Sequence, residues 1–485
     1  MERKISHLEP KIVWSAFEDV CQVPRPSKNE EKIIAFLERF AQANCLSYKK
    51  DSVGNVLISK PASKGFENRP TVVLQSHLDM VCEKNSNVVH DFFTDPIKPI
   101  IDGEWVKAQG TTLGADCGIG IAASMAALTD PEIEHGPLEC LFTVDEETGL
   151  TGAMALEPGF LSGKILLNLD SEDEGQLFIG CAGGIDTLAS YSFKNESVAG
   201  SFFAMHISVA GLKGGHSGDD INKGRGNAIK ILSRFLWEAY HKYGIRIAHI
   251  EGGNLRNAIP REASAVILVQ KGYKENLVAE FNIFKHEISS ELLITEPNLK
   301  FDHNSIEDPE FIIDEKTTVQ ILNALFICPN GVFNMSYNMP GMVETSTNLA
   351  SVKITDNSTL LVTTSQRSDI ESGKNNIAAI VNTVFEITGA TVRHSDGYPG
   401  WSPNPHSPVL KVVEAAYEQL FNIKPLVRSI HAGLECGLFL EKYPDLDMVS
   451  FGPTILGAHS PDERIEIETV QKFWKLLKAV LKNIQ

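Results

Sequence analysis

Histidine and carboxylate residues follow several predicted strands of this sequence, and together they could bind metal ions and move protons. In open α/β sheets, functional sites form outside the carboxyl ends of the strands. Side chains that follow different strands therefore meet in one pocket. The residues in question are His77, Asp79, Glu146, Glu147, Asp170 and His459, together with Asp116, which opens a predicted helix.

Such a pocket needs positive charge, because buried acids without cations are energetically costly. A pair of divalent metal ions would supply that charge. Imidazole and carboxylate ligands without a thiolate suit zinc, cobalt or manganese, and zinc is the commonest choice. Two ions need a shared carboxylate, and about five protein ligands leave room for water. The pattern indicates a metal-dependent hydrolase.

Two neighbouring pairs of residues suggest a division of labour. Asp79 lies two residues after His77, where it could return to the imidazole and fix its tautomer. Of the adjacent Glu146 and Glu147, one could bind a metal and the other could act on water as a general base. Taken singly, His77 is better explained as a structural histidine, and the two glutamates as a solvated acidic turn. The gathering of these groups favours the functional interpretation.

The segments that carry these residues alternate between strand and helix patterns. Ser27 followed by Glu30 predicts a capping box that opens a helix. Short apolar, β-branched runs separated by helices predict an α/β sheet that is covered on both faces. The predicted strands are 55–59, 71–76, 139–144, 164–170 and 448–451. The other predicted helices are 116–128, 408–420 and 468–481.

The middle of the chain has a different pattern, with alternating strands and long polar helices. Strands are expected near 203–209, 263–269 and 351–363, which indicates an α+β unit inserted into the first. The expected organisation is a catalytic domain with a central mixed sheet, formed by residues 1–186 and 390–485. Residues 187–389 would form an inserted lid that binds substrate.

Composition limits the possible partners. At about 150 residues per domain, 485 residues predict roughly three structural units. Sixty-two acidic and 44 basic residues give a net charge of −18, which disfavours nucleic acid and anionic membrane surfaces. Eight widely spaced cysteines and an N-terminus without an apolar signal segment favour the cytoplasm.

Eight ordered blocks of the sequence resemble a known family. The chain is similar, over nearly its whole length, to the dinuclear-zinc metallopeptidase family of aminoacylases, glutamate carboxypeptidases and carnosine-type dipeptidases. The blocks are residues 75–81, 110–116, 145–149, 168–172, 214–218, 256–262, 431–437 and 457–463.

The resemblance implies a role for each metal-ligating candidate. His77, Asp116 and Asp170 would hold one zinc ion. Asp116, Glu147 and His459 would hold the second, so that Asp116 bridges the pair. Cobalt or manganese could substitute for zinc.

The resemblance also implies how the remaining polar residues of this pocket act. Asp79 would orient His77, and Glu146 would be the catalytic base. A cis peptide bond is expected after Asp116. The next residue is Cys117, where relatives often carry Asn or Asp, and this departure removes no ligand.

Three residues of the inserted unit match substrate-binding positions of the family. His216 would steady the oxyanion, Asn257 would bind substrate, and Arg367 would hold a terminal carboxylate, which a planar guanidinium fits bidentately. Their ordinary interpretations are a histidine in a Gly-rich loop, a turn asparagine and a surface arginine. His431 and Glu435 are interpreted as supporting structure or pocket lining.

The implied activity is hydrolysis of dipeptides with a free N-terminus, of the Xaa-His or carnosine type, with broad specificity. An N-acyl amino acid deacylase or desuccinylase with the same metals is the alternative. A nucleotide-binding oxidoreductase is disfavoured because residues 118–123 lack the third glycine of the fingerprint. A non-catalytic binding protein would lack a ligand or the base, and none is missing. A homodimer is expected.

Overall fold

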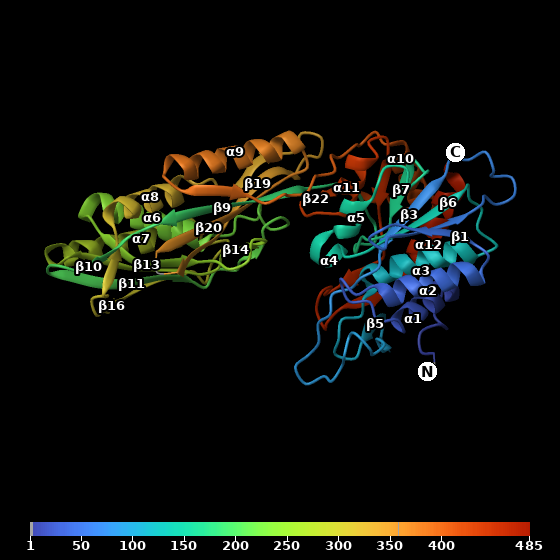
Figure 1. The fold of residues 1–485 in the computed structure, drawn as a ribbon, viewed down its shortest axis with the longest axis horizontal. Coiled ribbons are helices and arrows are strands. Elements are labelled where there is room, and N and C mark those ends of the chain that lie inside the picture. Colours follow the sequence, from blue (N-terminus) through green and yellow to red (C-terminus); the bar gives the residue numbers. More distant parts are fainter. Residues whose placement is uncertain (1–2, 357) are drawn as a thin grey trace. The chain divides into compact units, whose positions relative to one another are not determined.

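The computed structural model describes residues 3–356 and 358–485 and divides the chain into two compact units. Unit 1 is built from both ends of the chain, coloured blue and red in Figure 1. Unit 2 is the middle of the chain. Unit 1 comprises Met1–Gly180, Pro403–Ser429 and Leu434–Gln485, and unit 2 comprises Cys181–Ser402 and Ile430–Gly433.

The seams therefore lie outside the positions expected from the sequence. Residue 187 falls within β9 (Gly183–Ser192), and residue 389 precedes β21 (Thr391–His394). Both strands pair with each other in the sheet of unit 2, so they belong to that unit. The short segment Ile430–Gly433 also joins unit 2, which the sequence pattern did not indicate.

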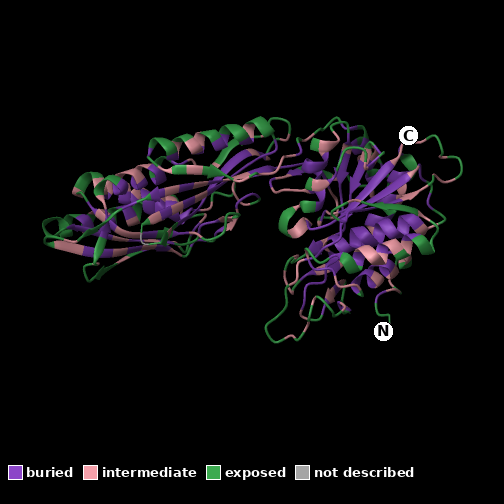
Figure 2. Cartoon of the chain, in the orientation of Figure 1, coloured by how far each residue is buried: buried purple, intermediate pink, exposed green. Residues whose placement is uncertain are grey.

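Unit 1 contains an eight-stranded mixed sheet. The strand β3 pairs in parallel with β6 and β7, whereas β1, β2 and β6 are joined by antiparallel pairs. Every residue of β3 and β6 is buried, so helices or loops cover both faces of the sheet (Figure 2). In sheet order the strands are β1 (Ser47–Lys50), β2 (Val56–Lys60), β6 (Leu138–Thr143), β3 (Val72–His77), β7 (Ile165–Asn168), β23 (Asp447–Ser450), β8 (Gln176–Cys181) and β22 (Leu426–Ile430).

The helices of unit 1 pack against this sheet. The Ala-rich α3 is buried nearly all round and lies between β3 and α1. Its small side chains allow this close approach to the strand. The helices are α1 (Lys11–Cys21), α2 (Glu31–Ala43), α3 (Ala115–Thr129), α4 (Glu146–Gly149), α5 (Thr151–Ala155), α10 (Pro408–Phe421), α11 (Glu435–Lys442) and α12 (Ile467–Asn483).

The predicted capping box at the start of α2 is wrong. The Ser27 hydroxyl donates instead to the Asp79 carboxylate, at 2.7 Å. Glu30 accepts from the backbone amides of Lys28 and Asp145, and α2 begins without a side-chain cap. Both side chains are used by tertiary contacts near the ends of β3 and β6.

A smaller four-stranded sheet completes unit 1. Its hairpin of β24 and β25 is joined by residues 457–463, the loop that carries His459. The antiparallel pairing therefore fixes both ends of that loop. The strands are β24 (Ile455–Leu456), β25 (Arg464–Glu466), β5 (Trp105–Ala108) and β4 (Pro99–Asp102).

Unit 2 is built on a nine-stranded antiparallel sheet. Burial alternates along β9 and β11, which is typical of a sheet with one covered and one solvated face. The predicted strand 351–363 is in fact two strands, because the chain reverses between Asp356 and Thr359. The strands are β16 (Lys300–Ile306), β11 (Phe202–Ala210), β15 (Ala263–Gln270), β13 (Arg246–Gly252), β19 (Val343–Asp356), β20 (Thr359–Ser368), β9, β21 and β18 (Gly331–Met335).

The helices of unit 2 pack against that sheet and share an apolar core with it, in which the Phe235, Phe281 and Phe301 rings meet. Two minor ribbons pair β10 (Asn195–Ser197) with β17 (Phe311–Ile313), and β12 (Gly215–His216) with β14 (Ala258–Ile259). Over the described residues of both units, no helix has the length and apolar character needed to cross a membrane. The helices of unit 2 are α6 (Ala228–Tyr243), η1 (Lys271–Tyr273), α7 (Lys274–Glu291), α8 (Glu315–Ile327) and α9 (Glu371–Ile387).

Candidate active site

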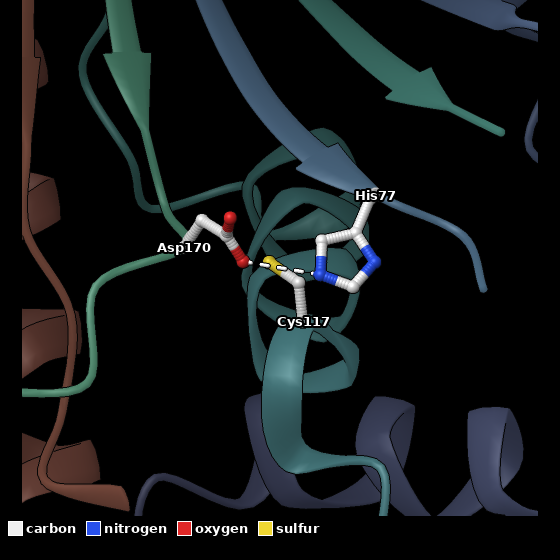
Figure 3. A group of neighbouring side chains, drawn as sticks. All are labelled: His77, Cys117 and Asp170. Carbon is white, nitrogen blue, oxygen red and sulfur yellow. Dashed lines mark ion pairs between the residues drawn. The ribbon is translucent and has the colours of Figure 1, made fainter. Parts of the chain in front are cut away.

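Two neighbouring strands of unit 1 place the first pair of candidate ligands. His77 is the last residue of β3, and Asp170 lies two residues beyond β7. These strands run in parallel and in register, with Gln75 opposite Asn168, so their carboxyl ends meet. The His77 Nε2 atom lies 3.3 Å from Asp170 Oδ1, as the dashed line in Figure 3 shows.

Asp116 joins this pair to a second one. Its Oδ1 lies 3.1 Å from His77 Nε2, and its Oδ2 lies 3.1 Å from Nε2 of His459. The same His459 nitrogen is 3.0 Å from Glu147 Oε2. The carboxylate of Asp116 therefore directs one oxygen to each imidazole, which is the arrangement expected of a shared ligand.

These residues fit divalent metal ions. Donor atoms of Asp116, Glu147 and His459 all lie within 4.8 Å of one another, and so do those of His77 and Asp170. Ligands at about 2.0–2.2 Å from a common zinc ion are separated by distances of this size. The Oε1 atom of Glu147 is buried and has no hydrogen-bond partner among the described residues, so a ligand position is left for it.

The imidazoles of His77 and His459 and the carboxylate of Asp116 shift one another's pKa values. Burial by itself would lower the pKa of His77, but the nearby carboxylates of Asp170 and Asp116 outweigh it and hold that pKa well above its usual value. Hydrogen bonds to Asp116 and Glu147 raise the pKa of His459 to about 11. Burial opposes ionisation of Asp116, yet the two imidazoles keep its pKa low. The pocket therefore favours positive charge between its carboxylates.

Asp79 contacts both the candidate ligand His77 and the turn that carries Glu146 and Glu147. Its carboxylate accepts from the backbone amides of Glu146 and Glu147, at 3.0 and 3.2 Å, and lies 3.4 Å from Nδ1 of His77. Burial raises the pKa of Asp79, but its contacts with His77 and Ser27 lower it to about 2, so the group is ionised. The side chain can thus orient the imidazole, as the sequence predicts.

Glu146 opens the short helix α4 beside this cluster. A donor oxygen of Glu146 lies within 4.8 Å of donor atoms of His77 and Glu147. Burial raises the pKa of the Glu146 carboxyl well above its usual value, and the negative charge of Asp170 adds to the effect. A carboxyl group with a raised pKa can both accept and return a proton near neutral pH.

Cys117 packs beside the first pair of ligands. Its peptide bond with Asp116 is cis, as expected. Figure 3 shows the sulfur atom near the line that joins Asp170 to His77, and all three donor atoms lie within 4.8 Å. The thiol donates to the carbonyl oxygen of Leu169 at 3.4 Å. The replacement by cysteine therefore leaves the predicted ligands together.

The three substrate-binding candidates all lie in unit 2. His216 belongs to β12, and the amide of the following residue, Ser217, donates to the Asn257 carbonyl oxygen at 2.8 Å. Arg367 lies on β20, is 8% exposed, and donates from Nη1 to the Tyr398 hydroxyl at 3.3 Å. Its Nε is buried and has no hydrogen-bond partner within the described ranges, which leaves a donor for an anion.

Further polar groups of unit 2 lie around Arg367 and His216. Asp219 is 3.3 Å from the Nδ1 atom of His216. Nε2 of His431 is 2.8 Å from the Ser346 hydroxyl, and burial, followed by repulsion from Arg367, lowers the pKa of His431 to about 3. The buried His431 is thus a neutral imidazole in this pocket.

Three buried residues of unit 1 received no specific functional role from the sequence. Glu435 accepts from Gln75 and Thr143, at 2.6 and 2.7 Å, and supports the strand ends, as its predicted supporting role requires. Arg25 and Glu463 bind the backbone around Asp116. Glu463 stands in the block 457–463 that resembles the family, whereas no pattern marks Arg25.

Comparisons with known proteins identify the family of this chain. The model of peptidase family M20/M25/M40 matches residues 73–483. The chain is 44% identical, over 481 residues and 99% of both chains, to the cytosol non-specific dipeptidase of Escherichia coli strain K12. The chain therefore belongs to peptidase family M20/M25/M40, and the enzyme class predicted from the sequence is confirmed.

Solved structures give the same result for the fold. The aminoacylhistidine dipeptidase of Vibrio alginolyticus is 43% identical, and the match covers 100% of this chain and 99% of that one with a TM-score of 0.94. An aminopeptidase of Bacillus cereus, at 18% identity and a TM-score of 0.58, shares the fold. The predicted α/β class with a mixed sheet is confirmed.

Proposed function

We propose that this peptidase hydrolyses dipeptides with a free N-terminus, with broad specificity that includes Xaa-His and carnosine-type substrates, and that it uses two zinc ions. The observation that carries the proposal is the placement of Asp116 between two imidazoles, each with a further carboxylate beside it. The relation over the full chain to a non-specific dipeptidase and to an aminoacylhistidine dipeptidase supports the substrate class.

The proposed ligands divide into two sets. His77, Asp116 and Asp170 would hold one ion, and Asp116, Glu147 and His459 the other. When bound, the ions would polarise the scissile carbonyl group and favour a water nucleophile at neutral pH. Cobalt or manganese could take the place of zinc, because the ligands are nitrogen and oxygen atoms.

Glu146 is the proposed general base and acid. It accepts a proton from the attacking water and then delivers a proton to the leaving amine. The raised pKa of its buried carboxyl supports both steps, because the protonated form is stable enough to persist until the amine departs. Asp79 assists by holding the amide of Glu146 and the ring of His77.

The three candidate residues of unit 2 are proposed to bind substrate. Arg367 would pair with the terminal carboxylate through its unpartnered Nε. Asn257 would bind the substrate backbone, and His216 would donate to the oxyanion that forms on the scissile carbonyl.

A substrate panel tests this proposal against the alternative of an N-acyl amino acid deacylase. Purified protein would be assayed with dipeptides, including carnosine and Xaa-His, and with N-acetyl and N-succinyl amino acids. Turnover of the dipeptides alone supports the proposal. Preferential hydrolysis of the acylated amino acids would refute it, because those substrates lack the free amine.

We further propose that the enzyme is cytoplasmic and forms a homodimer. The edge strand β18 pairs only with β19 among the described strands. Its Phe333 and Met335 side chains are 42% and 43% exposed. Apolar residues on an open strand edge favour pairing with another chain, and a second copy is the partner always present.

A further inference from the structure

The segment that carries Asp116 is not held by its own helix. Asp116 has φ −79° and ψ 115°, and Cys117 is also non-helical, so α3 becomes regular only after these residues. The backbone amides at a helix start have no partner within the helix. Other groups must therefore fix the position of the Asp116 carboxylate.

Glu463 supplies that contact on the amide side. Its carboxylate, 2% exposed, accepts from four consecutive backbone amides: Leu113 at 2.7 Å, Gly114 at 2.9 Å, Ala115 at 2.7 Å and Asp116 at 3.3 Å. Glu463 also lies four residues after His459, in the same loop. One side chain therefore joins the loops of two proposed ligands of the second metal.

Arg25 supplies the matching contact on the carbonyl side. It is 2% exposed and donates to the carbonyl oxygens of Leu78, Asp79 and Gly114. It thereby joins the segment after His77 to the segment before Asp116. Gly114 has φ +68°, and a Cβ there would lie 2.6 Å from Arg25 Nη2, so only glycine allows this approach.

We propose that Arg25 and Glu463 are positioning residues that clamp the Leu113–Asp116 segment and so hold Asp116 between the two metals. The inference rests on the metal assignment proposed above. Both are buried charges compensated chiefly by peptide groups. Such an arrangement costs desolvation energy, which the hydrogen bonds to the backbone offset while they fix the position of that backbone. A fixed backbone keeps both Asp116 oxygens aligned.

The test is Glu463→Gln, in which an amide group replaces one acceptor oxygen and faces backbone amides with a donor. The matched control is Glu18→Gln. Glu18 is a 5% exposed carboxylate that accepts from the backbone amides of Lys4, Ile5 and Ser6 in the same unit. Zinc affinity would be measured by chelator competition. The visible spectrum would be recorded after Co²⁺ loading. Stability would be measured by thermal unfolding of the metal-free proteins.

Glu463→Gln is expected to weaken zinc binding by about 10- to 100-fold, the usual effect of losing a group that orients a ligand. Its Co²⁺ spectrum should change, while Glu18→Gln keeps both properties. Arg25→Lys, which retains charge but not the fork of donors, should behave like Glu463→Gln. Parental zinc affinity and Co²⁺ spectrum in Glu463→Gln would overturn the inference. So would failure of Glu463→Gln to fold when Glu18→Gln folds, because the role would then be general stability.

Asp116→Asn separates this inference from the metal assignment on which it rests. Lost zinc binding in Asp116→Asn together with intact binding in Glu463→Gln refutes the clamp alone. Intact binding of two ions in Asp116→Asn refutes the proposed metal site, and the clamp with it.

Discussion

At the scale of single residues, the carboxylates of the proposed site have few positively charged side chains beside them. Asp116 and Asp170 approach one imidazole, His77, and Asp116 and Glu147 approach another, His459. Protons on those imidazoles balance the charge in the metal-free protein. Metal ions would replace these protons, and the same imidazole nitrogens and carboxylate oxygens would then serve as ligands.

Glu146→Gln should reduce kcat by about 10²- to 10⁴-fold, the usual contribution of a general base, and leave metal binding intact. Glu147→Gln, a change in the adjacent residue, should instead lower metal content because it removes a proposed ligand. Steady-state kinetics and elemental analysis of the two variants check this. Full activity in Glu146→Gln would contradict its assignment as the base.

Zinc affinity should rise with pH. In the metal-free protein the hydrogen bonds that His459 donates to Asp116 and Glu147 raise its pKa to about 11, so the imidazole is protonated near neutral pH. Zinc must displace that proton, and affinity therefore rises by about tenfold per pH unit for each proton released. Chelator competition between about pH 6 and pH 8 measures the slope. His459→Ala should give a shallower slope, and an equal slope would contradict this coupling.

At the scale of elements, local patterns predict the strands and the candidate polar residues that follow them, and the assignment of those residues as metal ligands comes from the family resemblance. Apolar runs mark β3, β6 and β7, and polar residues follow each of them. The Ser27 hydroxyl donates to Asp79, which is distant in the sequence, instead of capping the nearby helix. A local pattern cannot reveal this contact, so the predicted cap is wrong. Arg25 binds carbonyl groups that are more than fifty residues away in the sequence, so no pattern near it reveals the contact.

Gly120 tests the packing that places the Asp116 segment on the sheet. A Cβ at this position of α3 would lie 2.6 Å from Cys117 Sγ and 2.9 Å from the backbone oxygen of Leu169. Gly120→Ala should therefore destabilise unit 1 by about 1–3 kcal/mol, the usual cost of overpacking. Gly272→Ala, where nothing lies within 4 Å, is the control for thermal unfolding. Parental stability in Gly120→Ala would show that this contact is not tight.

At the scale of the whole molecule, the chain separates its tasks between two units. Unit 1 gathers the proposed metal ligands and the base, and unit 2 gathers the groups suited to an anionic substrate end. Alternating strands predicted the α+β character of unit 2. That residues 430–433 also belong to unit 2 depends on pairing between distant segments. The backbone amide of Ala182, for example, donates to the carbonyl oxygens of Ile430 and Ala432.

The proposed homodimer should depend on β18. Phe333→Glu places a charge on the exposed strand edge and should convert a dimer to a monomer in sedimentation velocity experiments. Ile387→Glu, at a 72% exposed apolar residue of α9, is the control and should remain dimeric. A monomeric parent protein, or a dimeric Phe333→Glu, would contradict the proposed interface.

The most direct test of the account is metal content together with dipeptide hydrolysis in one preparation. Purified protein would be assayed with carnosine and a set of Xaa-His dipeptides before chelation, after chelation, and after zinc is returned. We predict two zinc equivalents per chain, loss of hydrolysis on chelation, and recovery in proportion to the zinc restored. Undiminished hydrolysis by fully metal-free protein would contradict the claim that these carboxylates and imidazoles act through bound metal.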